Sequence, residues 1–197
     1  MPKFSLFSLI LAAGESSRFG SNKQLIEFGG ETLVNRTVRL AEDICGDRTI
    51  LVVGNDWERV LDACSPLCGF FVYNDNYKSG IASSIVCGIN AVAHSADAIL
   101  LLMADQPLIT SQHLKSLISE WREAQNEIVI SEYSSIQGPP VIFPAQCFNN
   151  LIKLKGDQGA RSLLTNPKFS IRSLTFDAAA IDIDTPEDFK KLKRNHN

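Results

Sequence analysis

Residues 9–24, Leu-Ile-Leu-Ala-Ala-Gly-Glu-Ser-Ser-Arg-Phe-Gly-Ser-Asn-Lys-Gln, join an apolar run to a loop of small residues that carries two cations. An apolar run that ends in glycine is typical of a buried strand. Gly14 and Gly20 allow positive φ angles, and successive backbone N–H groups in such a turn bind anions. Arg18 and Lys23 add full positive charge. The stretch therefore predicts a nucleotide-phosphate loop after the first strand of an α/β domain.

The same stretch also fits an ordinary strand-to-helix turn whose Arg and Lys are solvated, because short glycine patterns match by chance. It is not a Walker A loop, since no Gly-Lys-Ser/Thr triplet is present. Gly14 and Gly20 are also too far apart for a Gly-x-Gly-x-x-Gly pattern. The rest of the chain has to decide between these two interpretations.

The composition excludes several classes of protein. The 197 residues fit one domain, residues 1–197, and the 45% of hydrophobic residues suffice for a sizeable core. A formal net charge of -3 argues against nucleic acid as a partner. No apolar stretch approaches the ~20 residues that a membrane span needs. The N-terminus lacks a basic region followed by a long apolar run and a cleavage site, so we expect a cytoplasmic protein.

The cysteines and histidines support neither a disulfide framework nor a hydrolytic triad. The 5 cysteines are odd in number and unevenly spaced, which favours buried thiols. Cys64 and Cys68 have the spacing of metal ligands, but no second Cys/His pair accompanies them. None of the 3 histidines stands beside a candidate nucleophile.

Strand and helix patterns alternate along the whole chain. The most apolar run, Ala98–Met103, is expected to be the central strand. Further strands are expected at 48–54, 69–73, 127–131, 141–143 and 171–176, with a Pro-rich turn between 131 and 141. Helices are expected at 31–44, from 56, at 81–92, 111–123 and 158–164, and from 186. Such alternation predicts a mostly parallel sheet with helices on both faces, whose ligands bind beyond the carboxyl ends of the strands.

Carboxylates occur where such a ligand site is expected. Asp105 directly follows the central strand, where it suits Mg²⁺, which one or two carboxylates and substrate phosphates typically hold. Alternatively, Asp105 shapes a turn or caps a helix. Asp182 and Asp184 share one face of a short extended segment, and either suits a second metal carboxylate. Alternatively, Asp184 or Thr185 simply caps the last helix.

Two glycine-containing clusters also suggest a ligand site. Residues 77–85 (YKSGIASSI) open a helix with small residues, so a base or ribose can approach its backbone N–H groups. Residues 156–161 (GDQGAR) place an acid and an arginine around two glycines. Arg161 suits a phosphate or carboxylate on an acceptor, and a surface ion pair with Asp157 is the alternative.

Taken together, these segments resemble the molybdenum cofactor cytidylyltransferases (MocA-like), within the broader MobA-like nucleotidyltransferase group. The matching segments are LAAGESSRFGSNK (11–23), NDNYKSGIASSI (74–85), LLMADQP (101–107), GPPVIF (138–143), GDQGAR (156–161) and DIDTPEDF (182–189). They follow the family's order over nearly the whole chain. The one departure is Ser16, where many relatives carry a second glycine. The resemblance implies a three-layer α/β/α Rossmann-like nucleotidyltransferase fold with a mostly parallel mixed sheet.

The resemblance also implies a role for each matching residue. The residues expected to bind the nucleotide are Ala12, Ala13, Gly14, Arg18, Lys23, Gly80 and Ser83. The residues expected to be catalytic are Arg18, Lys23 and Asp105, with Mg²⁺ held by Asp105 and Asp184. The residues expected on the acceptor side are Gln106, Pro107, Gly138, Pro139, Asp157 and Arg161.

The implied reaction transfers CMP from CTP to the terminal phosphate of molybdopterin or the molybdenum cofactor. Such a phosphate is largely dianionic near neutral pH and needs no general base. Guanylyl-transferring relatives usually have Leu-Ala-Gly-Gly, and the methyl of Ala13 should favour a pyrimidine. The alternatives are guanylyl or other nucleotidyl transfer, another acceptor such as a sugar phosphate or methylerythritol phosphate, or a non-catalytic carrier. A carrier would hand the cofactor to a molybdenum hydroxylase or its maturation factor.

Overall fold

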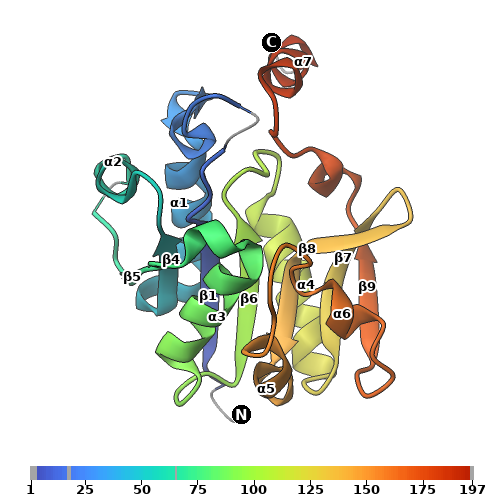
Figure 1. The fold of residues 1–197 in the computed structure, drawn as a ribbon. Helices are drawn as coiled ribbons and strands as arrows, with labels where there is room; N and C mark the ends of the chain where they lie inside the picture. The colour runs from blue at the N-terminus through green and yellow to red at the C-terminus, as the bar shows by residue number, and fades with distance from the viewer. Residues whose placement is uncertain (1–3, 17–18, 65, 196–197) are drawn as a thin grey trace.

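A 7-stranded sheet forms the centre of the molecule (Figure 1). The structure is a computed structural model that describes residues 4–16, 19–64 and 66–195. The strands, in spatial order, are β5 (Phe70–Tyr73), β4 (Thr49–Val53), β1 (Leu6–Ala12), β6 (Ala98–Met103), β8 (Ile136–Pro144), β7 (Ile128–Tyr133) and β9 (Ile171–Thr175). The expected central strand, β6, therefore lies in the middle of the sheet.

The sheet is mostly parallel, as expected, with one reversed strand. Strands β5, β4, β1 and β6 pair in parallel, and β7 pairs in parallel with β9. Strand β8 is antiparallel to both of its neighbours, β6 and β7. The carboxyl ends of β1 and β6 consequently meet at one edge of the sheet, since Leu11 pairs with Met103.

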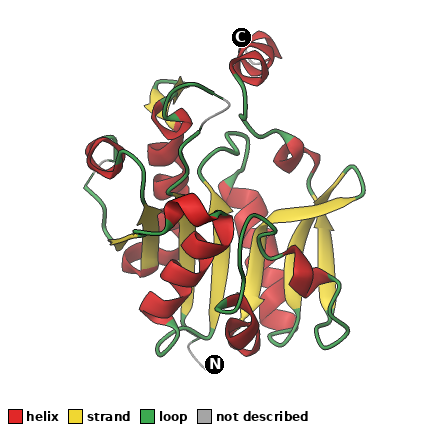
Figure 2. Cartoon of the chain, viewed as in Figure 1, coloured by secondary structure: helices red, strands yellow, loops and turns green. Residues whose placement is uncertain are grey.

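Helices cover both faces of the sheet, which confirms the three-layer α/β/α architecture (Figure 2). The longer helices pack on the sheet through amphipathic faces. One face carries α1 (Leu33–Cys45) and α4 (Ser111–Glu123), and the other carries α3 (Ile81–Val92), α5 (Phe148–Leu151) and α6 (Arg161–Leu164). Helix α2 (Trp57–Asp62) lies beside β5, and α7 (Pro186–Asn195) stands apart from the sheet.

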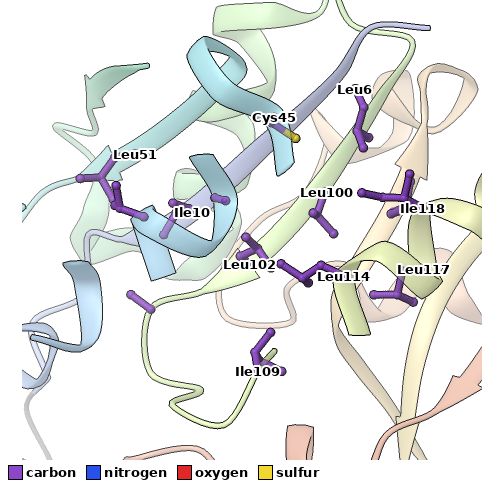
Figure 3. Close-up of a cluster of buried hydrophobic side chains, with 14 of the residues drawn as sticks. Leu6, Ile10, Cys45, Leu51, Leu100, Leu102, Ile109, Leu114, Leu117 and Ile118 are labelled. Carbon is purple, nitrogen blue, oxygen red and sulfur yellow. The ribbon is translucent and has the colours of Figure 1, made fainter. Parts of the chain in front are cut away.

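Each face of the sheet has its own hydrophobic core because strand side chains alternate. In β1, Ile10 packs with α1 and α4, whereas Leu9 and Leu11 pack on the side of α3. Figure 3 shows the first of these cores, in which Ile10 lies near Leu102 and Leu114. The two cores fix the sheet, and with it the loops that follow β1 and β6.

The sequence predicted most elements within a few residues, but the Pro-rich turn was wrong. The β7–β8 hairpin turns at Ser134 and Ser135, both with positive φ, and Pro139 and Pro140 lie inside β8. The pairing shifts register between Ile130 and Ser131, so a bulge accommodates the prolines.

A third hydrophobic cluster joins the C-terminal segment to the N-terminal loop. Ile183 and Leu192 pack with Leu33 at the start of α1, and Phe19 and Ile26 of the loop after β1 pack against them. The loop also contains η1 (Lys23–Leu25) and the short strands β2 (Glu27–Phe28) and β3 (Glu31–Thr32). The remaining 3-10 turns are η2 (Gly46–Arg48), η3 (Tyr77–Ser79), η4 (Ala145–Cys147) and η5 (Asp177–Ala180).

Within the described ranges, no helix has both the length and the apolarity that a membrane crossing requires.

Candidate active site

Lys23, Asp105 and Asp184 meet beyond the carboxyl ends of β1 and β6. Lys23 Nζ lies 2.6 Å from Asp105 Oδ2 and 2.7 Å from Asp184 Oδ1. All three side chains are largely shielded from solvent, at 14%, 12% and 27% exposure. Segments separated by 161 positions in the sequence thus share one ion-pair cluster.

The electrostatics of this cluster keep the lysine charged. Burial by itself lowers the pKa of Lys23, but the charges and hydrogen bonds of Asp105 and Asp184 outweigh burial, and the net pKa lies above its usual value. One ammonium therefore bridges two carboxylates. It provides a fixed positive charge at the point where β1 and β6 end.

The structure distinguishes the two candidate acids before α7. Asp184 binds Lys23, whereas Asp182 lines a neighbouring cavity. Burial, followed by the negative charges of Asp105 and Asp184, raises the pKa of Asp182. The backbone N–H of Ile183 donates to the carbonyl of Asp105 at 3.0 Å, which ties the two acidic segments together. Helix α7 is capped by Thr185, whose Oγ1 accepts from the Asp188 N–H at 3.2 Å.

A first cavity of about 450 Å³ opens beside Lys23. Of the predicted site residues it is lined by Ala13, Gly14, Lys23, Gly80, Asp105 and Asp157. Its apolar lining includes Leu11, Ile81 and Met103. A cavity of this size, lined by both apolar and charged residues, is suited to a small charged ligand with a flat apolar part.

Gly80 joins two distant motifs at the wall of the first cavity. It has φ of 101°, which favours glycine, and any Cβ on it would lie 2.4 Å from Asp157 Oδ1 and 2.5 Å from the Gly156 backbone. The Ala82 N–H donates to the Gly156 carbonyl at 3.1 Å. The absence of a side chain at Gly80 is therefore what lets the 156–161 loop dock on the start of α3.

Two of the predicted nucleotide contacts point elsewhere. Ala12 is buried in the core under α1, and it does not line the first cavity. The Ser83 hydroxyl donates to the Gly80 carbonyl at 2.8 Å and lines a groove on the other side of α3. The next residue, Ser84, lines the first cavity instead. Buried Asn74 donates to both Ser83 Oγ and Ser84 Oγ, at 2.8 and 3.0 Å, and thereby holds both hydroxyls.

A second cavity of about 340 Å³ adjoins the first and shares Asp105 and Asp157 with it. Predicted acceptor-side residues that line it are Gln106, Gly138, Pro139, Asp157 and Arg161. Pro107 does not line it; the Pro107 carbonyl accepts from Arg36 Nε at 2.7 Å. Arg36 thus anchors the loop that carries Asp105.

The second cavity is lined by both apolar and polar residues. Gln106 is buried, and its Nε2 donates to the carbonyls of Pro139 and Ala179 at 3.0 and 2.9 Å. Tyr133 reaches over Gly138, where an added Cβ would lie 2.1 Å from the tyrosine Oη. Burial raises the pKa of Tyr133, so the phenol is neutral and available as a donor.

The sequence interpretation missed Gln24, Ser84 and Tyr133 as lining residues. Gln24 and Ser84 lie next to the predicted residues Lys23 and Ser83. Their motifs therefore indicated the ligand site, but they did not show which side chains point into the cavity. Tyr133 had no signal, because only the hairpin brings it to the cavity. The predicted catalytic residue Arg18 lies outside the described residues.

Comparison with known proteins places this site in a family. Residues 8–171 match the MobA-like NTP transferase domain. The chain belongs to the MobA-like NTP transferase family. The matched residues include the strand residues that line the two cavities, but the match ends before Asp182 and Asp184.

Several known proteins are similar to the chain over nearly its whole length. It is 29% identical to the purine catabolism protein PucB of Bacillus subtilis, over 96% of each chain. It is 24% identical to the molybdenum cofactor cytidylyltransferase of Escherichia coli, over 95% of each. Rv0371c from Mycobacterium tuberculosis superposes with a TM-score of 0.85 and 28% identity, over 97% of this chain and 98% of that one.

The donor set at Asp105 and Asp184 fits a divalent cation. A structure of Rv0371c in complex with manganese matches with a TM-score of 0.80 and 26% identity, over 95% of this chain and 97% of that one. Carboxylate oxygens suit Mg²⁺ and Mn²⁺. Among the residues that the structure describes, no group of three or more His, Cys, Asp or Glu side chains can hold a metal. Two carboxylates would suffice for a metal that substrate phosphates also hold.

Proposed function

We propose that the protein is a nucleotidyltransferase that moves CMP from CTP to the terminal phosphate of a molybdopterin-type acceptor and releases pyrophosphate. The observation that carries this proposal is the position of Asp105, which lines both cavities and pairs with Lys23. A donor nucleotide in the first cavity and an acceptor in the second would meet at this carboxylate. The family membership supports the reaction class.

The transfer itself is an in-line displacement. An oxygen of the acceptor phosphate forms a bond to the α-phosphorus, and the bond from that phosphorus to the oxygen of the β-phosphate breaks. The acceptor phosphate has a second pKa of about 6, so it attacks as a dianion without a general base. His113 is not placed to act as such a base: it is buried against Ser131 of β7, it lines neither cavity, and burial lowers its pKa to about 4.

The chain's own residues would supply position and charge. Lys23 would contact the α-phosphate and the leaving pyrophosphate, because its ammonium is held at the junction of the cavities. The 14–16 loop and Gly80 would hold the nucleotide, and Gln106 and Arg161 would orient the acceptor. Mg²⁺, held by Asp105 and Asp184, would neutralise phosphate charge and act as a Lewis acid.

The choice of CTP rests on Ala13 and on the relatives. Ala13 is buried and lines the first cavity, so its methyl group narrows the space for a base. A single methyl discriminates by only ~1–3 kcal/mol. The Escherichia coli relative that covers 95% of this chain is a cytidylyltransferase of the molybdenum cofactor. Both points favour cytosine over guanine.

The test is to incubate the protein with Mg²⁺, molybdopterin or its molybdenum form, and each of CTP, GTP, ATP and UTP in turn. We expect pyrophosphate release with CTP and a cytidine dinucleotide product that mass spectrometry identifies. A strong preference for GTP would overturn the base assignment. Nucleotide binding without pyrophosphate release from any of the four would favour the carrier, which would then be tested for transfer of the cofactor to a molybdenum hydroxylase.

A further inference from the structure

Gln24 is a buried amide beside the first cavity to which the proposed reaction assigns no role. Its side chain is 4% exposed and lines that cavity. It follows Lys23 directly in η1, so the amide and the ammonium are carried by the same short turn. A buried polar group without a partner costs about 1–3 kcal/mol, so the hydrogen bonds of this amide have to be accounted for.

One end of the Gln24 amide is held by Ser16. The Ser16 hydroxyl donates to Gln24 Oε1 at 3.3 Å and accepts from the backbone N–H of Lys23 at 3.2 Å. The hydroxyl proton is directed at Oε1, which leaves Nε2 at the other end of the amide.

The other end of the amide faces the cavity. Within the described part of the chain, Nε2 of Gln24 makes no hydrogen bond, and it is absent from the polar atoms that are sealed from solvent without a partner. A Cβ built on Gly14 would stand 4.0 Å from this Nε2, so the nitrogen lies across from the glycine that begins the loop. Two N–H donors are therefore presented to whatever ligand occupies the first cavity.

Ser16 adopts a backbone conformation that is costly for serine. Its φ is 52°, in the left-handed region that favours glycine. Its carbonyl accepts from Phe19 and Gly20 at 2.9 and 3.3 Å, which closes the loop. A glycine would satisfy the same backbone turn with less strain. The hydroxyl is thus what serine adds, and both of its contacts are with Lys23 and Gln24.

We propose that Gln24 is a nucleotide-binding residue whose Nε2 donates to a triphosphate oxygen, and that Ser16 is the residue that positions it. The inference rests on the proposed function, since it takes the first cavity as the nucleotide site. The triphosphate is the favoured acceptor because Gln24 follows the charged Lys23 in η1 and is held by the polar Ser16, and both of these residues line the cavity. A flat base suits the apolar side at Leu11, Ile81 and Met103 instead.

The test is isothermal titration of CTP, inorganic tripolyphosphate and cytidine, with Mg²⁺ and without acceptor, so that no turnover intervenes. Gln24→Met keeps the length and removes the donor, and we expect about 10- to 100-fold weaker binding of CTP, the scale of a hydrogen bond to a charged group. Gln24→Glu keeps the oxygen that Ser16 binds and replaces the donor with a negative charge, so its loss should be larger. Gln125→Glu, at the end of α4 and outside both cavities, is the matched control.

Ser16→Gly separates positioning from folding. Glycine adopts the φ of this position freely, so the melting temperature should be unchanged or higher. The affinity for CTP should nevertheless fall several-fold, because the amide of Gln24 loses its anchor. A purely structural serine would leave the affinity unchanged, and that result would overturn the positioning role.

The remaining outcomes separate this inference from the proposed function. If tripolyphosphate loses affinity by the same factor as CTP, the contact with the triphosphate is supported. A loss for CTP that tripolyphosphate does not share would overturn the triphosphate contact. Wild-type affinity in folded Gln24→Met would overturn the inference alone. A wild-type protein that binds no nucleoside triphosphate would overturn the proposed function and the inference with it.

Discussion

The two cavities are similar in size but are built differently. The first is lined largely by loops after β1 and before α3, in which glycines and small residues bring backbone close to the ligand space. The second is lined by side chains of the β7–β8 hairpin and of α6, with Tyr133 over Gly138. A backbone-lined site depends on local motifs that persist when side chains vary. A side-chain-lined site changes with each substitution, so under the proposed function the choice of acceptor can diverge while nucleotide binding is kept.

The largest effect is expected where the cavities join. Asp105→Asn keeps the shape of a side chain that lines both cavities but removes the charge that pairs with Lys23. Turnover should fall by about 10³-fold or more, because the metal carboxylate and the lysine partner are lost together. Pyrophosphate release measures this, with the exposed Asp62→Asn of α2 as control. Wild-type turnover in Asp105→Asn would contradict the assignment of the junction.

Lys23→Ala should lower kcat by about 10²–10³-fold, the scale of one lost transition-state contact. The variant also leaves Asp105 and Asp184 facing each other without the ammonium between them. The exposed Lys115→Ala of α4 is the matched control. If only the KM for nucleotide rose and kcat stayed constant, the lysine would belong to the first cavity alone and would not serve the junction.

The contact between α4 and the β7–β8 hairpin should be sensitive to acid. His113 Nε2 lies 2.7 Å from Ser131 Oγ, which donates to the Pro140 carbonyl at 2.8 Å, and the imidazole stacks on Phe176. Burial lowers the pKa of His113 to about 4. Because the unfolded state then binds the proton more readily, this histidine's contribution to stability is full above pH ~6.5 and is lost as the pH falls towards about 4.

The loss of unfolding free energy attributable to His113 should be about 2 kcal/mol between pH 7 and pH 5, and should approach about 3 kcal/mol near pH 4. Denaturant unfolding at pH 7 and pH 5 measures it. A His113→Gln variant should show a smaller fall between the two values than the wild type, whereas the exposed His94→Gln should match the wild type. Equal falls in His113→Gln and the wild type would assign the acid sensitivity to other groups.

The smallest effect is expected for Gly138→Ala, which should change the second cavity without changing the first. Gly138→Ala places a methyl group where the Tyr133 hydroxyl lies, so the ring has to move within the second cavity. We expect the KM for acceptor to rise about tenfold, from overpacking at one wall. The KM for nucleotide should stay constant, because Gly138 does not line the first cavity. Steady-state kinetics with each substrate varied in turn tests this, and an equal rise in both values would mean that the cavities act as one.

The sequence predicted the fold well where a pattern is local. Helix α4 has the expected bounds because its apolar positions recur at helical spacing and Thr110 accepts from the His113 N–H at its start. The hairpin was harder to predict, since Pro139 and Pro140 favour a turn by composition. Only the paired register, with its bulge near Ser131, shows that they lie in a strand.

The sequence motifs predicted which segments form the candidate site, but they did not predict where each side chain points. The sequence placed Asp105 at a strand end, and the structure pairs it with Lys23. It left Asp182 and Asp184 equivalent, because a two-residue spacing places both on one face. Packing of Ile183 between them sends one to Lys23 and the other to the second cavity. In the same way, only the hydrogen bonds of Asn74 separate the roles of Ser83 and Ser84.

The ion pair between Lys23 and Asp184 can form only late in the synthesis of the chain. The two residues are 161 positions apart, so a ribosome has to deliver nearly all of the described chain before they meet. The sheet and both of its cores are assembled from residues before Asp177 except for Ala179. A nascent chain can thus bury its cores first and acquire the junction of its two cavities only when the C-terminal helix docks on the N-terminal loop.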